Sequence, residues 1–558
     1  MGVAVEGSGP EQTYEERPAS AGETPMVVSR ASRRPQSRWY ADPLNVGAAL
    51  VVLAAVVVGL WLRYRYYTVV EPGPDSDEAE FALLADQLLR GEVPIVMRGQ
   101  PYGGTPWLIA IAVSIRAFGM NVFGLRLPTV VLGITNVALI FAIGRQLGWS
   151  VRRAALGAGS IWCYPMATVF FASRETMYFV PAVTCSLVTL LLVLRLEAQR
   201  DPTVEHLGAT SWSRRLLFLA GLAAGVGLWI NPGSLYISGP TLLWLGVRSA
   251  REAYATTESW GRRAWLAARP GTAAGVGLVV GASPLLFVNL VGYDRRNNYS
   301  DRIGYSLVER LELLARQQAP GWLGFKVPLG GYTEGAWLGG AVWKLAFLAL
   351  ALLFVFQTVR RSSVRNESVV TFLALACPFV FLLVTAQSGP IYANLRYIFF
   401  ASPILSLLIV AKWRREWLAV AAAATLPLVS AAGVLAWQVN QGETVESTVE
   451  LLEARGATCA IGDYWAGGYR VMFHSEGKIA TAMTYENRDP VFLEQAEDRG
   501  NCPWIFKDGD PYANLLLGYL DAQGIGVEVQ RPGAGLVVFF PDQRVWLTDV
   551  FPDAVPAN

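Results

Sequence analysis

The fold is decided where the apolar run VGAALVVLAAVVVGLWL (residues 46–62) is followed by the acidic stretch EPGPDSDEAEFALLADQLLR (residues 71–90). The run is about as long as the helix that crosses a bilayer core. The first ten residues of the second stretch contain five carboxylates: Glu71, Asp75, Asp77, Glu78 and Glu80. An amphipathic helix is predicted over residues 78–90. Acids beside a bilayer occur where water, a cation or a reacting group meets them, so this stretch predicts a functional site.

Two interpretations of the acidic cluster compete. In the first, Asp75 or Ser76 caps the helix, and the other acids complement the helix dipole or are solvated. We adopt this interpretation for Glu71 and Glu80. For Asp77, which lies at the expected membrane surface beside an apolar helix, we favour a functional role.

The composition of the whole chain is that of a membrane protein. Of its 558 residues, 53% are hydrophobic and 16% are charged, whereas about a quarter of the residues of soluble domains are charged. Long apolar runs predict a polytopic α-helical membrane protein with about eleven spans. The predicted spans are residues 45–65, 125–146, 153–172, 178–195, 216–231, 234–248, 271–291, 340–359, 367–386, 396–411 and 416–437.

The net charge argues against a nucleic-acid partner, and the histidine content excludes a His-rich zinc site. The formal net charge is +2, and the arginines are spread over loops, so no nucleic-acid partner is expected. The chain has two histidines, His206 and His474. A His-rich zinc site is therefore excluded, and any metal would be held mainly by oxygen.

Basic residues predict the orientation and the domain boundaries. They are concentrated in alternate inter-helix loops, which stay in the cytoplasm, although Arg63 and Arg65 oppose this pattern. The acidic stretch then lies outside. The predicted parts are a disordered cytoplasmic tail (1–44), a transmembrane domain (45–437) with outer loops 66–124 and 292–339, and an extracytoplasmic domain (438–558).

The outer domain is expected to be an α/β domain. Helical and strand patterns alternate over residues 445–540, which favours a mostly parallel sheet covered by helices. No GxGxxG or P-loop marks a nucleotide site. Acceptor binding and a structural cap both remain open roles. Cys459 and Cys502 could form a disulfide if this domain is outside the cytoplasm.

Two arginines, Arg174 and Arg396, are the basic residues of the short outer loops. Each adjoins an apolar span, so each could be an interfacial arginine whose head group reaches water. Alternatively, their guanidinium groups could capture a phosphate. Tyr392 and Tyr397 beside Arg396 could add a hydrogen-bond donor or belong to the aromatic belt.

Several tracts occur in a recognisable order: Asp77-Glu78, Gly99–Thr105 (GQPYGGT), Phe118-Gly119, Leu125–Pro128 (LRLP), Ala172–Arg174 (ASR), Gly281–Pro284 (GASP) and Arg396-Tyr397. In this order the chain resembles the bacterial GT-C membrane glycosyltransferases, the group with the protein O-mannosyltransferases and the lipid A aminoarabinose transferases. The tract Gly462–Trp465 (GDYW) is similar to one in the outer domain of some bacterial relatives.

The resemblance implies an enzyme of the bacterial plasma membrane. It would move a sugar, with inversion, from a polyprenyl-phosphate donor to a hydroxyl of a glycan, lipid or protein acceptor at the outer face, among membrane lipids. On this analogy Asp77 is the general base and Glu78 supports it, as the catalytic pair. Arg174 and Arg396 would stabilise the departing phosphate.

Three further residues are candidates for substrate binding: Asp75, Tyr102 and Tyr392. Some relatives use a divalent cation, so Asp75, Asp77 and Glu78 could hold Mg²⁺ or Mn²⁺. Many relatives carry an aspartate shortly after the arginine that matches Arg174, whereas this chain has Glu175 there.

The main alternative is a transporter or flippase that moves a lipid-linked saccharide without chemistry. Transporters typically show repeated halves and charged residues or broken helices at the membrane midplane, and the sequence shows no internal repeat. A second alternative is a non-catalytic assembly factor whose outer domain binds a partner.

Overall fold

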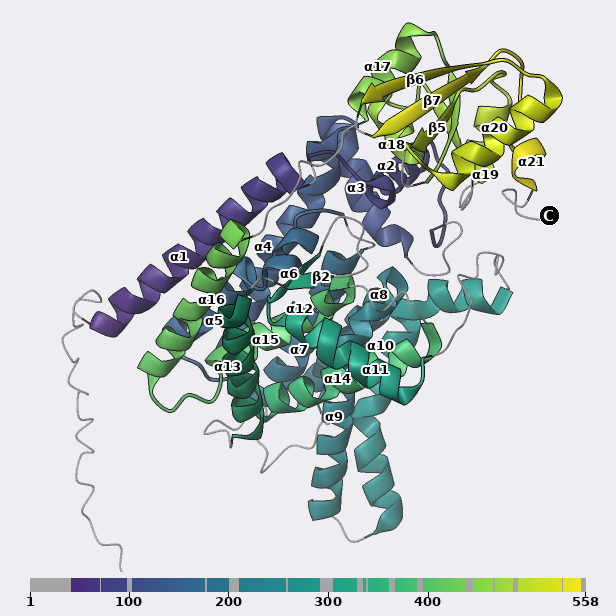
Figure 1. Ribbon diagram of the computed structural model, residues 1–558. Coiled ribbons are helices and arrows are strands. Elements are labelled where there is room, and N and C mark those ends of the chain that lie inside the picture. The colour runs from purple at the N-terminus through teal and green to yellow at the C-terminus, as the bar shows by residue number, and fades with distance from the viewer. Residues whose placement is uncertain are drawn as a thin grey trace, which may run out of the picture.

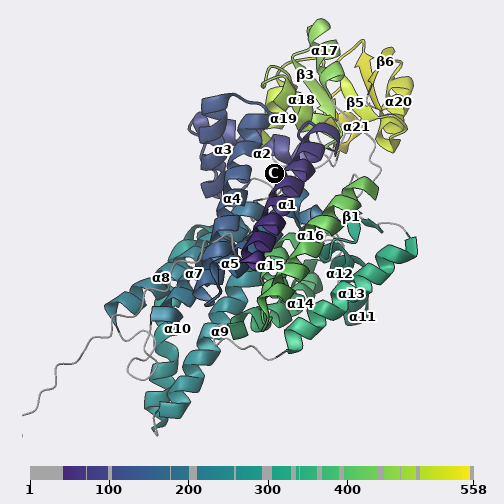
Figure 2. The ribbon, with the colours of Figure 1, turned by 90° about the vertical axis from the view of Figure 1, so that its left-hand side faces the viewer.

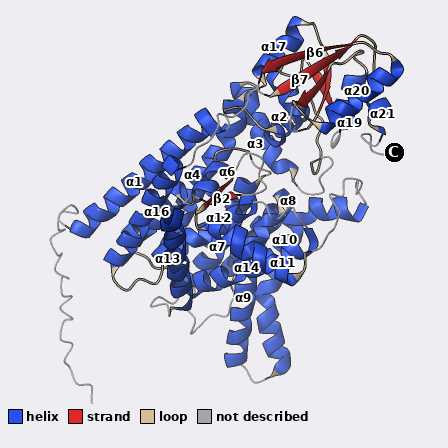
Figure 3. Ribbon diagram, in the orientation of Figure 1, coloured by secondary structure: helices blue, strands red, loops and turns tan. Residues whose placement is uncertain are grey.

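A computed structural model describes most of the chain (Figure 1). The described residues are 42–70, 72–97, 103–175, 178–199, 210–256, 259–291, 305–328, 335–337, 340–360, 367–388, 395–436, 445–464, 467–484, 490–533 and 535–552. A helical body makes up most of the molecule, and a small α/β domain lies at one end of it (Figure 3). The predicted tail, residues 1–44, falls almost entirely outside the described residues.

Each predicted span is helical in the structure. The helices of the body are α1 (Pro43–Arg65), α2 (Ser76–Leu89), α3 (Thr105–Phe118), α4 (Val122–Gln146), α5 (Val151–Cys163), α6 (Met166–Phe171), α7 (Phe179–Gln199), α8 (Ser211–Ile230), α9 (Leu235–Thr256), α10 (Trp260–Val291), α11 (Leu307–Leu313), α12 (Ala319–Trp322), α13 (Gly340–Val359), α14 (Ser368–Ser388), α15 (Ser402–Val410) and α16 (Glu416–Ala436). Short strands β1 (Lys326–Pro328) and β2 (Gly335–Trp337) pair antiparallel.

Within the described residues, seven helices are long and apolar enough to cross a membrane by length and composition. These are α1, α4, α7, α8, α10, α13 and α16. The chain is thus a multi-pass membrane protein, as predicted, and the number of eleven spans stays a prediction. The predicted span 153–172 is divided, because Tyr164 is extended before Pro165 and separates α5 from α6.

The C-terminal domain is an α/β domain, as predicted. Its helices are α17 (Glu446–Ala454), α18 (Gly468–His474), α19 (Pro490–Glu497), α20 (Pro511–Gln523) and α21 (Leu547–Val550). Its strands are β3 (Cys459–Gly462), β4 (Ala480–Met483), β5 (Trp504–Lys507), β6 (Val527–Gly533) and β7 (Leu536–Pro541), in the sheet order β4-β3-β5-β7-β6. The first three are parallel, and β7 is antiparallel to both neighbours, so the sheet is mixed. A disulfide joins Cys459 to Cys502.

The α/β domain packs on the body through its helix α18, which contacts α2. Figure 2 shows the domain above α2 and α3, with the connected ends of α9 and α10 at the opposite end of the molecule. The acidic stretch therefore lies where the two domains meet.

Helices α8 and α10 form a closely packed pair along two short glycine repeats. Gly221 and Gly225 of α8 face Gly277 and Gly281 of α10. A Cβ atom at Gly221 would lie 1.9 Å from the carbonyl oxygen of Ala274, and one at Gly277 would lie 2.1 Å from that of Phe218. The two backbones thus touch, which is the usual role of small-xxx-small patterns in membrane helices.

We expect the Gly221→Ala variant to be less stable than the wild type. Alanine favours a helix by about 1 kcal/mol over glycine, but overpacking costs about 1–3 kcal/mol. The matched control is Gly275→Ala in α10, where an added Cβ would meet no atom within 4 Å. Thermal unfolding in detergent should show a lower Tm for the first variant alone, and equal shifts would contradict the packing.

Candidate active site

Helix α2 carries the acidic cluster and is almost entirely buried. Its N-cap is Asp75, whose side chain accepts a hydrogen bond from the backbone N–H of Glu78 at 2.9 Å. This confirms the capping interpretation for Asp75. Asp77 is 3% exposed, and Glu78 and Glu80 are 0% exposed. The expectation that Glu80 is solvated is wrong, because α2 lies between the body and the α/β domain. Glu71 lies outside the described residues.

Glu78 is locked in place by Arg126, from the first turns of α4. The Nε atom of Arg126 donates to Oε1 of Glu78 at 2.9 Å, and Nη2 donates to Oε2 at 2.6 Å. Nη2 also donates to the carbonyl oxygen of Gly73 at 2.8 Å. The backbone N–H of Glu175 adds a hydrogen bond to Oε1 of Glu78 at 2.9 Å. This two-point ion pair is fully buried, so each charge depends on the other.

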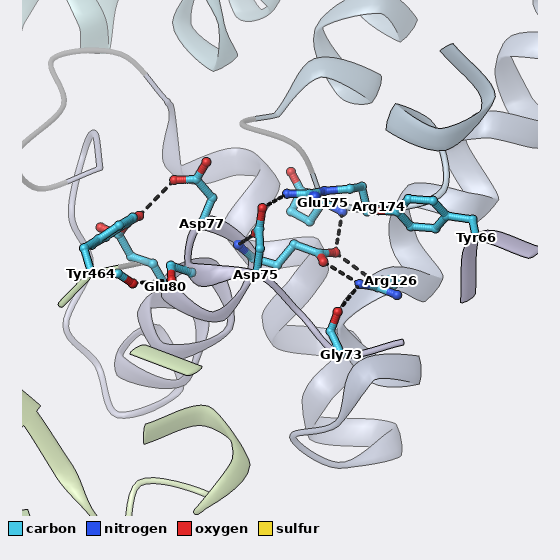
Figure 4. A network of polar contacts seen from close by, with 11 residues as sticks. Tyr66, Gly73, Asp75, Asp77, Glu80, Arg126, Arg174, Glu175 and Tyr464 are labelled. Carbon is cyan, nitrogen blue, oxygen red and sulfur yellow. Dashed lines mark hydrogen bonds and ion pairs between the residues drawn. The ribbon is translucent and has the colours of Figure 1, made fainter. Parts of the chain in front are cut away.

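Arg174 forms the second buried ion pair, with the side chain of Asp75. Its Nη1 atom also donates to the hydroxyl of Tyr66 at 3.4 Å. Arg174 is 2% exposed. The structure thus brings together four residues that the sequence singled out, Asp75, Asp77, Glu78 and Arg174. Figure 4 shows Asp75, Asp77 and Arg174 in this network.

Glu175, next in the chain, is a buried acid that ties three segments together. Its Oε2 atom accepts from the indole N–H of Trp107 at 2.6 Å and from the hydroxyl of Thr129 at 2.7 Å. Its Oε1 atom accepts from the backbone N–H of Tyr178 at 3.1 Å. Burial raises the pKa of Glu175 to about 7, and these hydrogen bonds oppose the rise.

Asp77 faces the α/β domain. The hydroxyl of Tyr464 lies 2.8 Å from Oδ1 of Asp77 and 2.9 Å from Oε2 of Glu80. The hydroxyl of Ser76 donates to the carbonyl oxygen of Tyr464. Figure 4 shows Asp77 directed toward Tyr464, on the opposite side of the network from Arg126 and Arg174. Asp75 and Glu78 each form an ion pair with an arginine, and Asp77 and Glu80 share the hydroxyl of Tyr464.

For three predicted site residues, Tyr102, Tyr392 and Arg396, the structure does not describe the side chain. Tyr102 and Tyr392 lie outside the described residues. Arg396 lies in a 3₁₀ helix, Leu395–Ala401, and its side chain is outside the described part of the structure. That 3₁₀ helix contacts α6, which ends three residues before Arg174.

The predicted cation site does not fit the arrangement of the acids. Asp75 binds a backbone amide and Arg174, and both oxygens of Glu78 bind Arg126. In the described part of the chain, no group of three or more His, Cys, Asp or Glu side chains is placed to hold a metal ion. We therefore assign no step to a metal.

The sequence did not single out a role for Arg126, Glu175 or Tyr464. Arg126 lies in the tract Leu125–Pro128 and Tyr464 in the tract Gly462–Trp465, both noted for their resemblance. An arginine in the first turns of an apolar span is itself a signal, since a membrane helix rarely carries an unpaired charge. A tyrosine contributed from almost 400 residues away leaves no comparable pattern.

Comparisons with known proteins identify the fold. No family model matches the chain, and no curated protein is similar to it in sequence. Among solved structures, it is similar to ArnT from Cupriavidus metallidurans bound to undecaprenyl phosphate, with 14% identity and a TM-score of 0.53. That match covers 88% of this chain and 97% of ArnT.

A second match is the archaeal oligosaccharyltransferase AglB from Archaeoglobus fulgidus, in complex with an inhibitory peptide and a dolichol-phosphate. It has 11% identity and a TM-score of 0.48, and it covers 91% of this chain and 75% of AglB. ArnT is a GT-C glycosyltransferase. The match to ArnT covers most of both chains, and the chain therefore has the GT-C fold of ArnT.

Proposed function

We propose that this protein is an inverting glycosyltransferase that moves a sugar from a polyprenyl-phosphate donor to an acceptor hydroxyl at the outer face of a bacterial plasma membrane. The observation that carries the proposal is the position of Asp77. It lies in the first turn of a buried helix between two domains, and the nearby acids Asp75 and Glu78 bind Arg174 and Arg126. The shared fold with ArnT, solved with undecaprenyl phosphate, supports the class of donor.

In the proposed reaction the acceptor oxygen attacks the anomeric carbon of the donor sugar. The bond between that carbon and the phosphate oxygen breaks, and its electron pair leaves with the polyprenyl phosphate. Asp77 takes the proton of the acceptor hydroxyl. Such a positioned base is worth about 10²–10⁴ in rate. A single displacement inverts the anomeric configuration.

The arginines support this assignment by dividing the acids into two groups. Arg126 and Arg174 bind Glu78 and Asp75, which fixes the start of α2 and balances two of its charges. Glu78 is then a supporting residue, since both of its oxygens are already bound. We assign the role of base to Asp77, in the first turn of α2, as the resemblance implies.

The leaving phosphate requires cationic groups on the side of the site near the membrane. Arg174 lies beside the start of α2, and Arg396 belongs to a segment that packs on the helix before Arg174. Negative charge grows on the phosphate as its bond to the sugar breaks, so fixed cations there lower the barrier selectively. For Arg174, this means that the phosphate competes with Asp75 for one guanidinium.

The Asp77→Asn variant should lose transfer activity. Asparagine keeps the size and the acceptor oxygen for Tyr464 but cannot take a proton, so we expect a loss of about 10²–10⁴ in kcat. The measurement uses purified full-length protein with a panel of polyprenyl-phosphate sugars. Asp86→Asn, the same change at a half-buried residue of α2, is the control. Unchanged transfer by Asp77→Asn would exclude Asp77 as the base.

The Glu78→Gln variant should lose stability. Removing one partner of a buried ion pair leaves Arg126 without its counter-charge and costs about 3–5 kcal/mol. Asp86→Asn again serves as the control, because Asp86 pairs with the exposed Arg90, and such surface pairs are worth about 0–1 kcal/mol. Thermal unfolding in detergent measures both, and a Tm for Glu78→Gln equal to the control would contradict the locking role.

The Arg396→Ala variant should bind undecaprenyl phosphate more weakly. A hydrogen bond between charged groups contributes about 1.5–3 kcal/mol, so the Kd should rise about 10-fold to 100-fold. Arg116→Ala, at the exposed end of α3, removes an arginine that plays no part in the proposed site. Equilibrium binding in detergent micelles gives the comparison. Equal Kd values for the two variants would remove Arg396 from the phosphate site.

A further inference from the structure

Tyr464 is a residue of the α/β domain that reaches the acids of the membrane domain. It lies two residues after β3, at the carboxyl end of the three parallel strands. Its side chain is fully buried. Its ring packs edge-on against that of Tyr469 from α18, with centroids 5.5 Å apart. The position of its hydroxyl is therefore fixed by its own domain.

The contact between Tyr464 and α2 has three points. The hydroxyl meets Asp77 and Glu80 at 2.8 Å and 2.9 Å, and the carbonyl oxygen accepts from Ser76. Asp77 and Glu80 are three residues apart, so they lie on the same face of the helix. A contact at three points of one helical turn fixes both the distance and the rotation of the domain relative to α2.

We propose that Tyr464 is a positioning residue for Asp77, so that the α/β domain completes the active site of the membrane domain. This inference rests on the proposed function, since it takes Asp77 as the base. The hydroxyl of Tyr464 binds Oδ1 of Asp77, and this contact holds the carboxylate in the orientation that receives the proton of the acceptor hydroxyl. Tyr464 keeps its own proton during the reaction, and the proton of the acceptor goes to Asp77.

The physical reason is the freedom of the carboxylate. An aspartate side chain can rotate about the bond to its carboxylate, and only some orientations direct a lone pair at the acceptor. A hydrogen bond from a rigid donor removes that freedom before the acceptor arrives. Without it, the donor lipid still binds, but a smaller fraction of complexes has the reactive geometry.

The first test is the Tyr464→Phe variant, which removes the hydroxyl and keeps the ring. We expect kcat to fall about 10-fold to 100-fold, as for the loss of a hydrogen bond to a charged group, with the KM for the donor unchanged. The matched control is Tyr519→Phe on α20, a tyrosine of the same domain that is partly buried in its core. Wild-type kcat in Tyr464→Phe, or a rise in donor KM with kcat unchanged, would overturn the proposal.

The second test does not depend on activity. Hydrogen–deuterium exchange compares wild type, Tyr464→Phe and Tyr519→Phe over the peptide that covers residues 76–84. We expect faster exchange in Tyr464→Phe alone, because the start of α2 loses two of its contacts with the α/β domain. Unchanged exchange in that variant would show that the hydroxyl does not hold α2 and would overturn the proposal.

The two proposals fail in different ways. If Asp77→Asn keeps full transfer activity, Asp77 is not the base, and the proposed mechanism fails together with the positioning role. If Asp77→Asn is inactive while Tyr464→Phe matches the wild type in kcat and exchange, the proposed function stands and the role of Tyr464 is wrong.

Discussion

The cost of burying charge is the constraint on which the site depends. Helix α2 takes Asp75, Asp77, Glu78 and Glu80 out of water within six residues. Burying a carboxylate without hydrogen-bond or ionic partners is costly. Arg126 and Arg174 meet this cost for two of the acids through buried ion pairs. Since a buried ion pair adds little net stability, its main effect here is to fix where the start of α2 lies.

The same ion pairs join segments that are distant in the sequence. Arg126 links α4 to the turn before α2 through Gly73, and the backbone of Glu175 links the segment after α6 to Glu78. Glu175 then holds α3 and α4 through Trp107 and Thr129. A change at any of these positions would therefore move the acidic helix as a unit. Its geometry is set by the body before the α/β domain contributes Tyr464.

Periodicity and length were enough to predict the elements of the fold. Apolar runs predicted α1, α4, α7, α13, α14 and α16 to within a few residues, and they also predicted α8, α9 and α10, whose ends are longer in the structure. They did not predict the division at Tyr164-Pro165, the 3₁₀ helix before α15, or α11 and α12, which lie in the predicted outer loop 292–339. Alternating patterns gave the α/β domain, although not the antiparallel pairing of β7 with β5. Strand direction depends on which strands become neighbours in space, and local patterns do not contain that information.

The site was predictable only in part, because local patterns also do not show which distant residues come together in it. Asp75, Asp77 and Glu78 stand out because acids beside an apolar run are unusual. Glu80 was assigned to solvent because nothing near it in sequence indicates that another domain covers it. Tyr464 is an ordinary residue in its own segment, and its role arises only from the packing of α18 on α2.

In the proposed mechanism, Arg174 has both a structural and a catalytic role. In the structure it binds Asp75, the cap of α2. A phosphate that approached Arg174 would be a second anion for the same guanidinium, and it would weaken the hold on Asp75. Because Asp75 also accepts from the backbone of Glu78, the helix would keep its cap during such an exchange. Donor binding would then be coupled to the first turn of α2, which also carries Asp77. The phosphate and the base would thus be linked through one helical turn.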